Sequence, residues 1–205
     1  MALDFPSSPT NGQVYADYYY DSTVGAWRAN AALAVGVPSG GEAGTFLTKN
    51  SSTDYDTEWS NLPTGTVIQV LSTAKTTVFS TTSTTIVDVT GMSVTITPKS
   101  TSSKILVMVT FLQSTNNAAT TNSFRIIRDS TSIGATGSTY YSSPFQNGLT
   151  GYWLALTFLD SPASTSALTY KLSMLTGAST TGYVGAYSQN TGLPSTSTIT
   201  VMEVA

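Results

Sequence analysis

The chain has 205 residues, a net charge of −3, no His and no Cys, and only 9% of its residues are charged. Without His and Cys, the sequence excludes Ser-His-Asp and Cys-His catalysis, ordinary zinc sites, haem and iron–sulfur ligation, and disulfides. Nucleic-acid binding is disfavoured because no dense cluster of Lys and Arg is present to neutralise phosphates. We therefore expect a protein that is not an enzyme and binds no cofactor.

Membrane and secretion signals are also missing from the sequence. Apolar runs such as residues 105–109 are far shorter than the ~20 residues that span a bilayer. The opening residues 1–6 show neither the basic region nor the apolar core of a signal peptide, so we expect no membrane insertion. Apolar residues make up 40% of the chain, with 11 Tyr, 7 Phe and 3 Trp, which predicts a buried core rather than a disordered stalk.

The net charge and the composition of the chain change near residues 63–65. Residues 1–64 hold two basic and seven acidic residues, a net charge of −5, and are rich in Pro, Gly, Asn and Asp. Residues 65–205 hold six basic and four acidic residues, a net charge of +2, and alternate between polar and apolar positions. This division predicts an N-terminal segment, 1–64, and a C-terminal head domain, 65–205.

The N-terminal segment is predicted to form short β-hairpins. Four runs have strand propensity: residues 13–20, 26–28, 45–49 and 57–59. Turn residues at 21–25 and 50–55 join them in pairs, and the small apolar residues 29–37 fit either a short helix or an extended linker. Hairpins of this size are marginal alone, so we expect the segment to be stable only in an oligomer or against a larger partner.

Alternation with a period of two begins at Gly65 and continues to the end of the chain. Residues 104–112 are apolar on both faces and are predicted to form a central strand, preceded by a turn at 98–103, while Thr90–Gly91 is expected to separate two strands. The predicted strands are residues 66–71, 85–89, 92–97, 104–112, 123–128, 131–135, 150–159, 167–175, 182–187 and 197–204.

This spacing, without a convincing amphipathic helix, predicts an all-β fold: an antiparallel jelly-roll-like β-sandwich head behind a hairpin-rich attachment segment. Ser and Thr supply about a third of the chain. Because Thr is β-branched and polar, it suits the outward positions of strands that carry few charges.

Three groups of polar residues raise the question of a chemical site. Asp54, Asp56 and Glu58 form the densest carboxylate cluster and could bind Ca²⁺, but the EF-hand spacing is absent and we favour a polar hairpin turn. The sequence leaves open whether these three residues bind a cation. Asp129 and Asp160 each end a predicted strand; a glycosidase pair needs a set separation, and we favour turn capping.

Ser102 and Lys104 share a strand face, as a Ser–Lys dyad would, but chance pairs are expected in a chain so rich in Ser, and we discount them. Arg125 and Arg128 are three apart on one strand and so point to opposite faces. We predict that one of them points inward or to an interface, in a structural ion pair with Asp88 or Asp129.

Aromatic side chains in the N-terminal segment are too large for so small a segment to bury. An exposed apolar patch usually marks an interface, and we favour docking or self-association over a self-contained mini-core. The predicted attachment residues are Phe5, Tyr18, Tyr19, Tyr20, Trp27 and Trp59.

A second aromatic group lies in the predicted loop 140–148. Rigid aromatics beside adaptable Ser, Asn and Gly form a plausible recognition surface, including for sugars. The alternative is a loop that packs back onto the sandwich or across a subunit interface, and the same question applies to Tyr183, Tyr187 and Asn190. The candidate receptor-contact residues are Tyr140, Tyr141, Phe145 and Asn147.

Several motifs resemble virion proteins of tailed phages, including cyanophages and other phages of marine and freshwater bacteria. The opening LDFPSSPTNGQVY at residues 3–15, with Tyr20–Asp21 and Gly25–Arg28, resembles their N-terminal attachment segment. GTFLTKN at residues 44–50, with Tyr55–Thr57 and Trp59, is similar to a module repeated in fibre stalks.

The C-terminal part resembles a domain recurrent in the same phage proteins. The matching stretches are Val67–Val70, Ile96–Pro98, Ser102–Val107, Phe124–Arg125, Arg128–Asp129, Phe158–Pro162 and Ile199–Val204. The resemblance implies a homotrimeric virion appendage that is assembled in the host cytoplasm, binds other virion proteins through its N-terminal part and presents a β-rich head. The long stalk and enzymatic region of larger tailspikes are missing, so depolymerase activity is not implied.

From these features we expect a short trimeric fibre whose head attaches to the host surface. The alternatives are a capsid decoration or cement protein and a lectin-like protein that binds a host glycan. The sequence leaves open whether the protein sits on the tail, the neck or the capsid.

Overall fold

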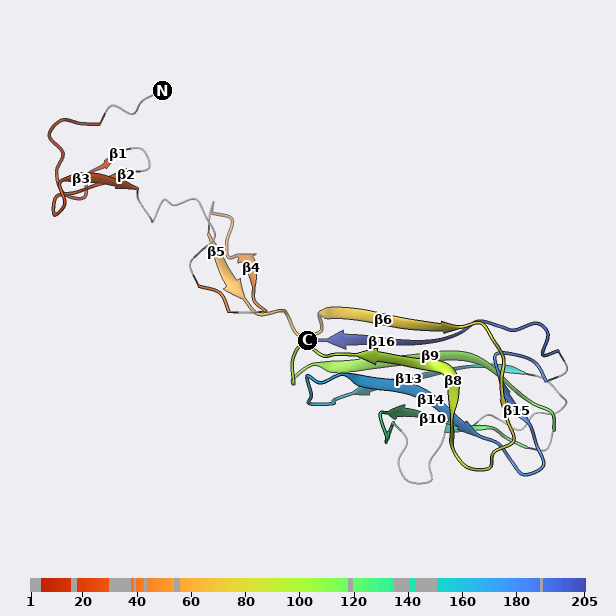
Figure 1. The fold of residues 1–205 in the computed structure, drawn as a ribbon. Coiled ribbons are helices and arrows are strands. Elements are labelled where there is room, and N and C mark those ends of the chain that lie inside the picture. Colours follow the sequence, from red (N-terminus) through yellow and green to blue (C-terminus); the bar gives the residue numbers. More distant parts are fainter. Residues whose placement is uncertain are drawn as a thin grey trace. The chain divides into compact units, whose positions relative to one another are not determined.

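The structure is a computed structural model that describes residues 5–15, 18–29, 38, 40–42, 44–53, 56–117, 120–134, 141–142, 151–188 and 190–205. It divides into two compact units, residues 1–62 and 63–205 (Figure 1). The described residues form strands and turns without a helix, which confirms the predicted all-β class. The residues that the structure describes therefore include no helix that is long and apolar enough to cross a membrane.

The first unit begins with a three-stranded antiparallel sheet in the order β1 (Val14–Tyr15), β2 (Tyr18–Asp21) and β3 (Ala26–Ala29). The hairpin between β2 and β3 was predicted, and the Asp21 carboxylate accepts the backbone N–H of Thr23 in its turn at 2.9 Å. The single predicted strand over 13–20 is wrong, because Tyr15 pairs with Tyr18 and the chain reverses between them. No Gly or Pro marks that reversal in the sequence.

The second hairpin of the first unit was predicted and is confirmed. It pairs β4 (Phe46–Lys49) with β5 (Thr57–Ser60), so that Phe46 lies opposite Ser60 and Lys49 opposite Thr57. The connection closes where the backbone N–H of Asn50 donates to the Asp56 carbonyl at 2.9 Å. Of the segment predicted as helix or linker, residues 30–37 lie outside the described residues.

The second unit is a β-sandwich of two antiparallel sheets, here called sheet I and sheet II. Sheet I contains β6 (Val67–Lys75), β7 (Phe79–Thr81), β9 (Lys104–Thr115), β13 (Tyr152–Asp160), β15 (Gly182–Val184) and β16 (Ser197–Val204). Sheet II contains β8 (Val87–Ile96), β10 (Ser123–Arg128), β11 (Thr131–Ile133), β12 (Tyr141–Ser142) and β14 (Leu168–Leu175).

Strand β9 is central, as predicted. Its residues 105–113 pair with β13, while residues 104–110 pair with β16 and 113–115 with β15. Since a strand has only two edges, β13 lies on one edge of β9, and β16 and β15 follow one another along the other. Sheet I therefore has the order β6-β16-β9-β13, with β7-β15-β9 continuing at one end. Sheet II has the order β8-β14-β10, followed by β11 and β12.

Most connections between the strands pass from one sheet to the other. The chain crosses between β7 and β8, β8 and β9, β9 and β10, β12 and β13, β13 and β14, and β14 and β15. The first and last long strands, β6 and β16, are neighbours (Figure 1). There the backbone N–H of Gly65 donates to the Ala205 carbonyl and that of Ala205 to the Thr66 carbonyl, each at 2.9 Å.

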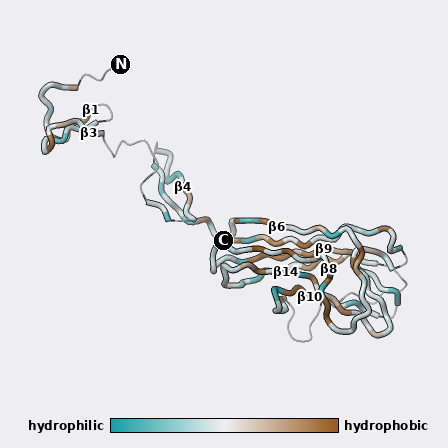
Figure 2. Tube along the Cα trace, viewed as in Figure 1, coloured by the Kyte–Doolittle hydropathy of each residue, from teal (hydrophilic) through white to brown (hydrophobic). Residues whose placement is uncertain are grey.

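Apolar side chains of both sheets form one hydrophobic core. The strands that supply them, such as β8 and β9, carry many of the hydrophobic positions coloured brown in Figure 2. On β9, Ile105, Val107, Val109 and Phe111 alternate with more exposed residues, as the period of two predicts. Phe111 contacts Phe124 of sheet II with ring centroids 4.7 Å apart. Both rings are fully buried, so they join the two layers at the centre of the sandwich.

The predicted break at Thr90–Gly91 is wrong, because β8 runs through it as one strand with a bulge. Lys171 pairs with Ser93, whereas Ser173 pairs with Asp88, so β8 carries extra residues at this point. Gly91 has a φ of 84°, which glycine adopts without strain. The short strands β7 and β12 were not predicted, since runs of three and two residues show no period.

Candidate functional site

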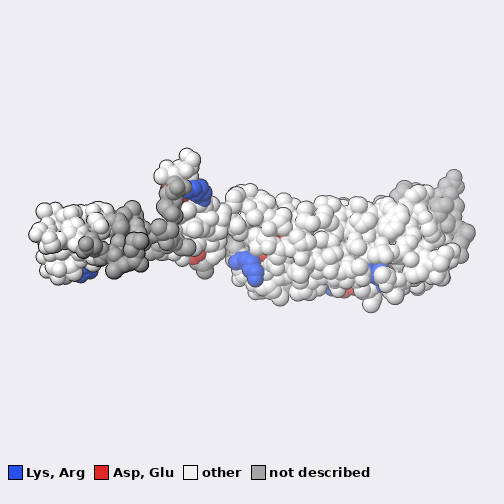
Figure 3. Space-filling model, turned by 90° about the horizontal axis from the view of Figure 1, so that it is seen from above, with Lys and Arg blue, Asp and Glu red and all other residues white. Residues whose placement is uncertain are grey.

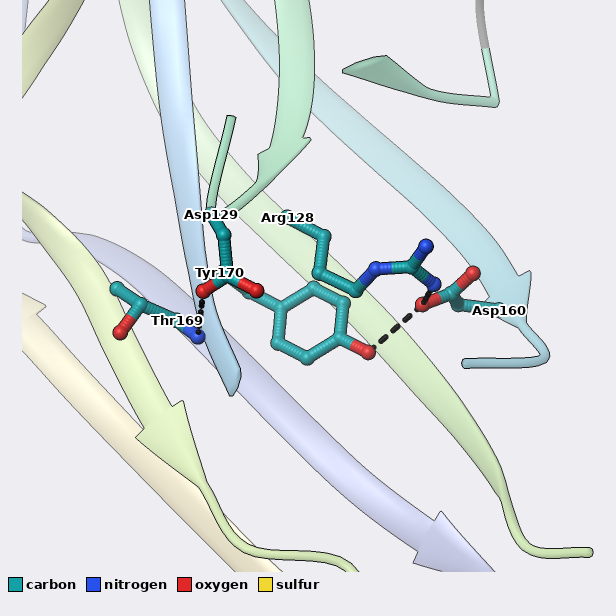
Figure 4. A network of polar contacts seen from close by, with 5 residues as sticks. All are labelled: Arg128, Asp129, Asp160, Thr169 and Tyr170. Carbon is teal, nitrogen blue, oxygen red and sulfur yellow. Dashed lines mark hydrogen bonds and ion pairs between the residues drawn. The ribbon is translucent and has the colours of Figure 1, made fainter. Parts of the chain in front are cut away.

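The carboxylate of Asp160, at the end of β13 in sheet I, binds two side chains of sheet II (Figure 4). Arg128 Nη1 lies 2.6 Å from Asp160 Oδ2, and the Tyr170 hydroxyl donates to the same oxygen at 2.7 Å. Asp160 and Tyr170 are buried. The prediction that one arginine of this strand points inward is correct, but its partner is Asp160 rather than Asp88 or Asp129.

This arrangement favours the protonated forms of Tyr170 and Arg128. Burial raises the pKa of Tyr170, and the hydrogen bond to Asp160 raises it further, so the hydroxyl stays protonated and acts as a donor. Burial opposes the charge on Arg128, but the hydrogen bond with Asp160 outweighs it, and the pKa of the guanidinium is raised. The group is thus a fixed ion pair with a neutral phenol, which supports a structural role for Asp160.

Asp129 is not part of the Asp160 ion pair but lies in the turn between β10 and β11 (Figure 4). Its Oδ1 accepts the backbone N–H of Thr169 at 2.9 Å, and its own N–H donates to the Thr169 carbonyl at 2.8 Å. Its φ of 53° is one that Asp tolerates in turns. This is the turn-capping role that the sequence favoured for this residue.

A second buried carboxylate lies where β6 and β16 meet the connection between β8 and β9. Glu203 is fully buried; its Oε2 accepts from Gln69 Nε2 at 2.6 Å and its Oε1 from the backbone N–H of Lys99 at 2.7 Å. Burial alone would raise the pKa of Glu203, but these hydrogen bonds outweigh it and the pKa is lowered. Glu203 was not among the predicted site residues.

The aromatic residues of the first unit cluster around Phe5. Its ring stacks on Trp27 with centroids 5.1 Å apart, meets Tyr18 edge-on at 5.4 Å and lies 5.8 Å from Tyr15. The ring of Tyr20 also contacts Trp27, with centroids 5.6 Å apart. Four of the predicted attachment residues therefore form a small aromatic core. Because this core remains half-exposed, its outer surface is still available to a partner.

The two other predicted attachment residues lie apart from that core. Tyr19 points from the opposite face of β2 and pairs with Val14 and Arg28. The indole N–H of Trp59 on β5 donates to the Pro38 carbonyl at 2.9 Å, and its ring packs over Gly41. A Cβ on Gly41 would lie 2.7 Å from that ring, and Gly41 has a φ of 96°, so this contact requires glycine.

The candidate receptor-contact loop is described only at Tyr141. Tyr141 is half-buried and packs against the hydrophobic core, whereas Tyr140, Phe145 and Asn147 lie outside the described residues. Tyr141 itself therefore follows the alternative in which the loop packs back onto the sandwich. Elsewhere on the head, Trp153 is 55% and Tyr187 44% exposed.

The predicted carboxylate cluster contributes to the hairpin turn of the first unit. The Ser51 hydroxyl donates to Asp56 Oδ2, and Glu58 is exposed on β5. Asp54 lies outside the described residues. Within the described ranges no group of three acidic residues is placed to hold a metal ion.

The face of the molecule drawn in Figure 3 carries few charged side chains.

Comparison with known proteins gives no family model and no curated protein that matches the chain. Among solved structures, the chain is similar to a chain of the infectious bursal disease virus Gt strain, with 12% identity and a TM-score of 0.38 over 76% of this chain and 42% of that one. It is also similar to a chain of the T=1 particles derived from that virus, with 11% identity and a TM-score of 0.36.

A crystal structure of the VP2 subviral particle of the same virus gives 13% identity and a TM-score of 0.34. These matches cover 40–42% of the viral chains, so this chain corresponds to less than half of their length. The neighbours are viral particle proteins, but at TM-scores below 0.5 the likeness carries no argument about this chain.

Proposed function

We propose that the chain is a non-enzymatic structural protein of a virion, a short trimeric fibre on the tail, neck or head of the particle. Residues 1–64 dock it onto other virion proteins, and residues 65–205 form a jelly-roll head displayed toward the host surface. The protein is assembled in the host cytoplasm. The observation that carries the proposal is the strand order of the head.

In a jelly roll, two packed sheets share a chain that passes back and forth between them, an architecture used by viral capsid and lectin domains. The orders β6-β16-β9-β13 and β8-β14-β10-β11, with six connections that cross between sheets, support this architecture for the head. The motifs that resemble phage virion proteins point to the same class. Support for a non-enzymatic role comes from Asp129 and Asp160, since structural contacts already engage both.

The docking role can be tested in particles that carry the gene. We expect the Phe5→Ala, Trp27→Ala double variant to be produced normally but to be absent from gradient-purified particles, because it removes the stacked pair at the centre of the aromatic core. Val24→Ala is the matched control, since Val24 lies in the same unit and is 51% exposed. Incorporation of the double variant at the control level would contradict docking through this segment.

The same particles distinguish the fibre from a capsid decoration or cement protein. A decoration protein would leave with the capsids when tails are sheared off, and a tail fibre would leave with the tails. Recovery with the tails would exclude a capsid decoration or cement protein, whereas recovery with the capsids alone would exclude a tail fibre and leave a head fibre and a decoration protein as the candidates.

A lectin-like receptor-binding protein is the second candidate, supported by the exposed rings of Trp153 and Tyr187. A Cβ on Gly151 would lie 2.9 Å from the Tyr187 ring, so that ring covers Gly151. Trp153 lies two residues after Gly151, so by strand alternation both exposed rings lie on the same side of the chain. Glycan-array binding that is lost in Trp153→Ala and kept in Leu193→Ala would support this candidate; absence of binding to host polysaccharides would count against it.

A further inference from the structure

We propose that the outer face of sheet I is the surface through which the head binds a second copy of this chain. The outer face comprises residues of β6, β16, β9 and β13 that point away from the core, with Trp153 at one end and Val204 and Lys104 at the other: Val70, Ser72, Ala74, Thr198, Thr200, Met202, Leu106, Met108, Thr110, Ala155, Thr157 and Leu159. The inference deepens the proposed function, on which it rests, by assigning the self-association to one surface.

Strand register aligns these residues into rows across the sheet. Met202 lies between Val70 and Leu106, and Leu106 lies beside Leu159, so one row is apolar on all four strands. Its two ends are well exposed, Val70 at 52% and Leu159 at 48%. A continuous apolar row on an open face of a sheet is a feature of interaction surfaces rather than of free solvent-facing sheets.

The neighbouring rows carry hydroxyl groups. Thr200 lies between Ser72 and Met108, and Thr157 follows Met108. Ser72 Oγ and Thr200 Oγ1 lie 2.8 Å apart and already share a hydrogen bond. The next row, from Ala74 to Ala155, is also small and uncharged.

The strands of sheet I carry four charged residues, and only Lys104 points to this face, at the end of β9 beyond the apolar row. The other three, Lys75, Asp160 and Glu203, are buried. Sheet II differs, because its outer side carries the ion pair of Lys171 with Asp88. Charges keep a free sheet face soluble, so a face with a single charge at its end is suited to contact rather than to solvent.

The chemistry of the face favours a second copy as its occupant. Around the symmetry axis of an oligomer identical groups of the copies meet, and like charges would repel there, whereas a hydroxyl both donates and accepts a hydrogen bond. A face of hydroxyls and aliphatic side chains is therefore complementary to itself. Among the described strands, β13 is also an edge paired only with β9, and its residues 152–159 contain no charge or Pro to block further pairing.

The test is the mass of the full chain in solution, measured by light scattering over a dilution series. We expect an oligomer for the wild type and, for Thr110→Lys, a dissociation constant raised by at least about tenfold, because the exposed Thr110 lies on the central strand of the face. Thr95→Lys is the matched control: Thr95 is also exposed, but on the outer side of sheet II. Its oligomer should be unchanged.

If Thr110→Lys fails to fold, as judged by circular dichroism, Ser72→Lys on β6 takes its place, since Ser72 is exposed on the same face. A folded face variant that assembles like the wild type would overturn the assignment of this surface and leave the proposed function intact. A wild type that is monomeric at every concentration would overturn both this inference and the trimeric fibre. Equal loss of assembly in Thr95→Lys would likewise overturn the assignment.

Discussion

The Tyr170 hydroxyl donates to Asp160 Oδ2 at 2.7 Å, and Arg128 Nη1 lies 2.6 Å from the same oxygen. Because β13 belongs to sheet I whereas β10 and β14 belong to sheet II, one carboxylate oxygen connects the two layers of the head. The side chain of Asp160 is 8% exposed and that of Arg128 22%, so water screens this contact only weakly.

Asp160→Asn is expected to destabilise the head by about 3 kcal/mol, since it leaves the partly buried Arg128 without its charge partner. The measurement is urea unfolding followed by circular dichroism. Asp88→Asn is the matched control: Asp88 also pairs with a cation at 2.6 Å, but its side chain is 54% exposed and the loss should stay below about 1 kcal/mol. Equal losses in the two variants would contradict the role of Asp160.

Tyr170→Phe is expected to cost about 1–2 kcal/mol, because it removes a buried donor and keeps the ring in the core. The cost should be smaller in the Asp160→Asn background, since the two residues share one hydrogen bond. A double-mutant cycle of the unfolding free energies measures this coupling. Strict additivity would show that the hydroxyl acts independently of Asp160.

The stability of the head should fall with acid through Glu203. The pKa of Glu203 is lowered in the folded state, so the folded carboxylate holds its proton less tightly than the unfolded one. Its contribution is therefore complete above the ordinary pKa of 4.5 and is lost as the pH falls from there through the folded pKa.

Urea midpoints measured from pH 3 to 7 should fall less steeply at the acid end for Glu203→Gln than for the wild type. Lys49→Gln in the first unit should leave the slope of the head unchanged, because Lys49 is not an acid and is exposed. If the urea midpoints of Glu203→Gln and the wild type fall equally steeply at acid pH, other carboxylates cause the loss of stability.

Gly91→Ala is expected to destabilise the head by about 1–2 kcal/mol, because the φ of 84° is costly for any residue with a Cβ. The added Cβ would meet only the Lys75 side chain, at 3.5 Å or more, so the cost arises from the backbone rather than from a collision. Thr90→Ala, at the exposed neighbouring position, should change the unfolding free energy by less than about 0.5 kcal/mol. Wild-type stability of Gly91→Ala would argue against the bulge.

Period-two alternation was sufficient to predict most strands of the head. Ser197–Val204 was predicted with the observed bounds, and the central place of β9 followed from its two apolar faces. The sequence predicts a break between two strands at Gly91, where the structure has a bulge within one strand. A glycine in a strand interior and a glycine in a turn interrupt the alternating pattern in the same way.

Partners of charged groups were harder to predict, because they depend on how two sheets face each other. The sequence predicts that one of Arg125 and Arg128 points inward or to an interface, but the partner of Arg128, Asp160, is far from it in the chain and belongs to the other sheet. The burial of Glu203 did have a signal, since it alternates with Ile199 and Val201 on the inward side of β16. For the aromatic residues, the small core around Phe5 depends on the chain reversal at Tyr15, which no turn residue marks clearly.

The most direct measurement of the central claim is cryo-electron microscopy of gradient-purified particles that carry the gene, with an antibody against residues 65–205 to locate the head. A trimeric virion appendage should give density on the particle for three copies of the β-sandwich around the appendage's own threefold axis, bound by the antibody. Antibody-negative particles, with the chain recovered only from the particle-free fraction, would contradict the claim.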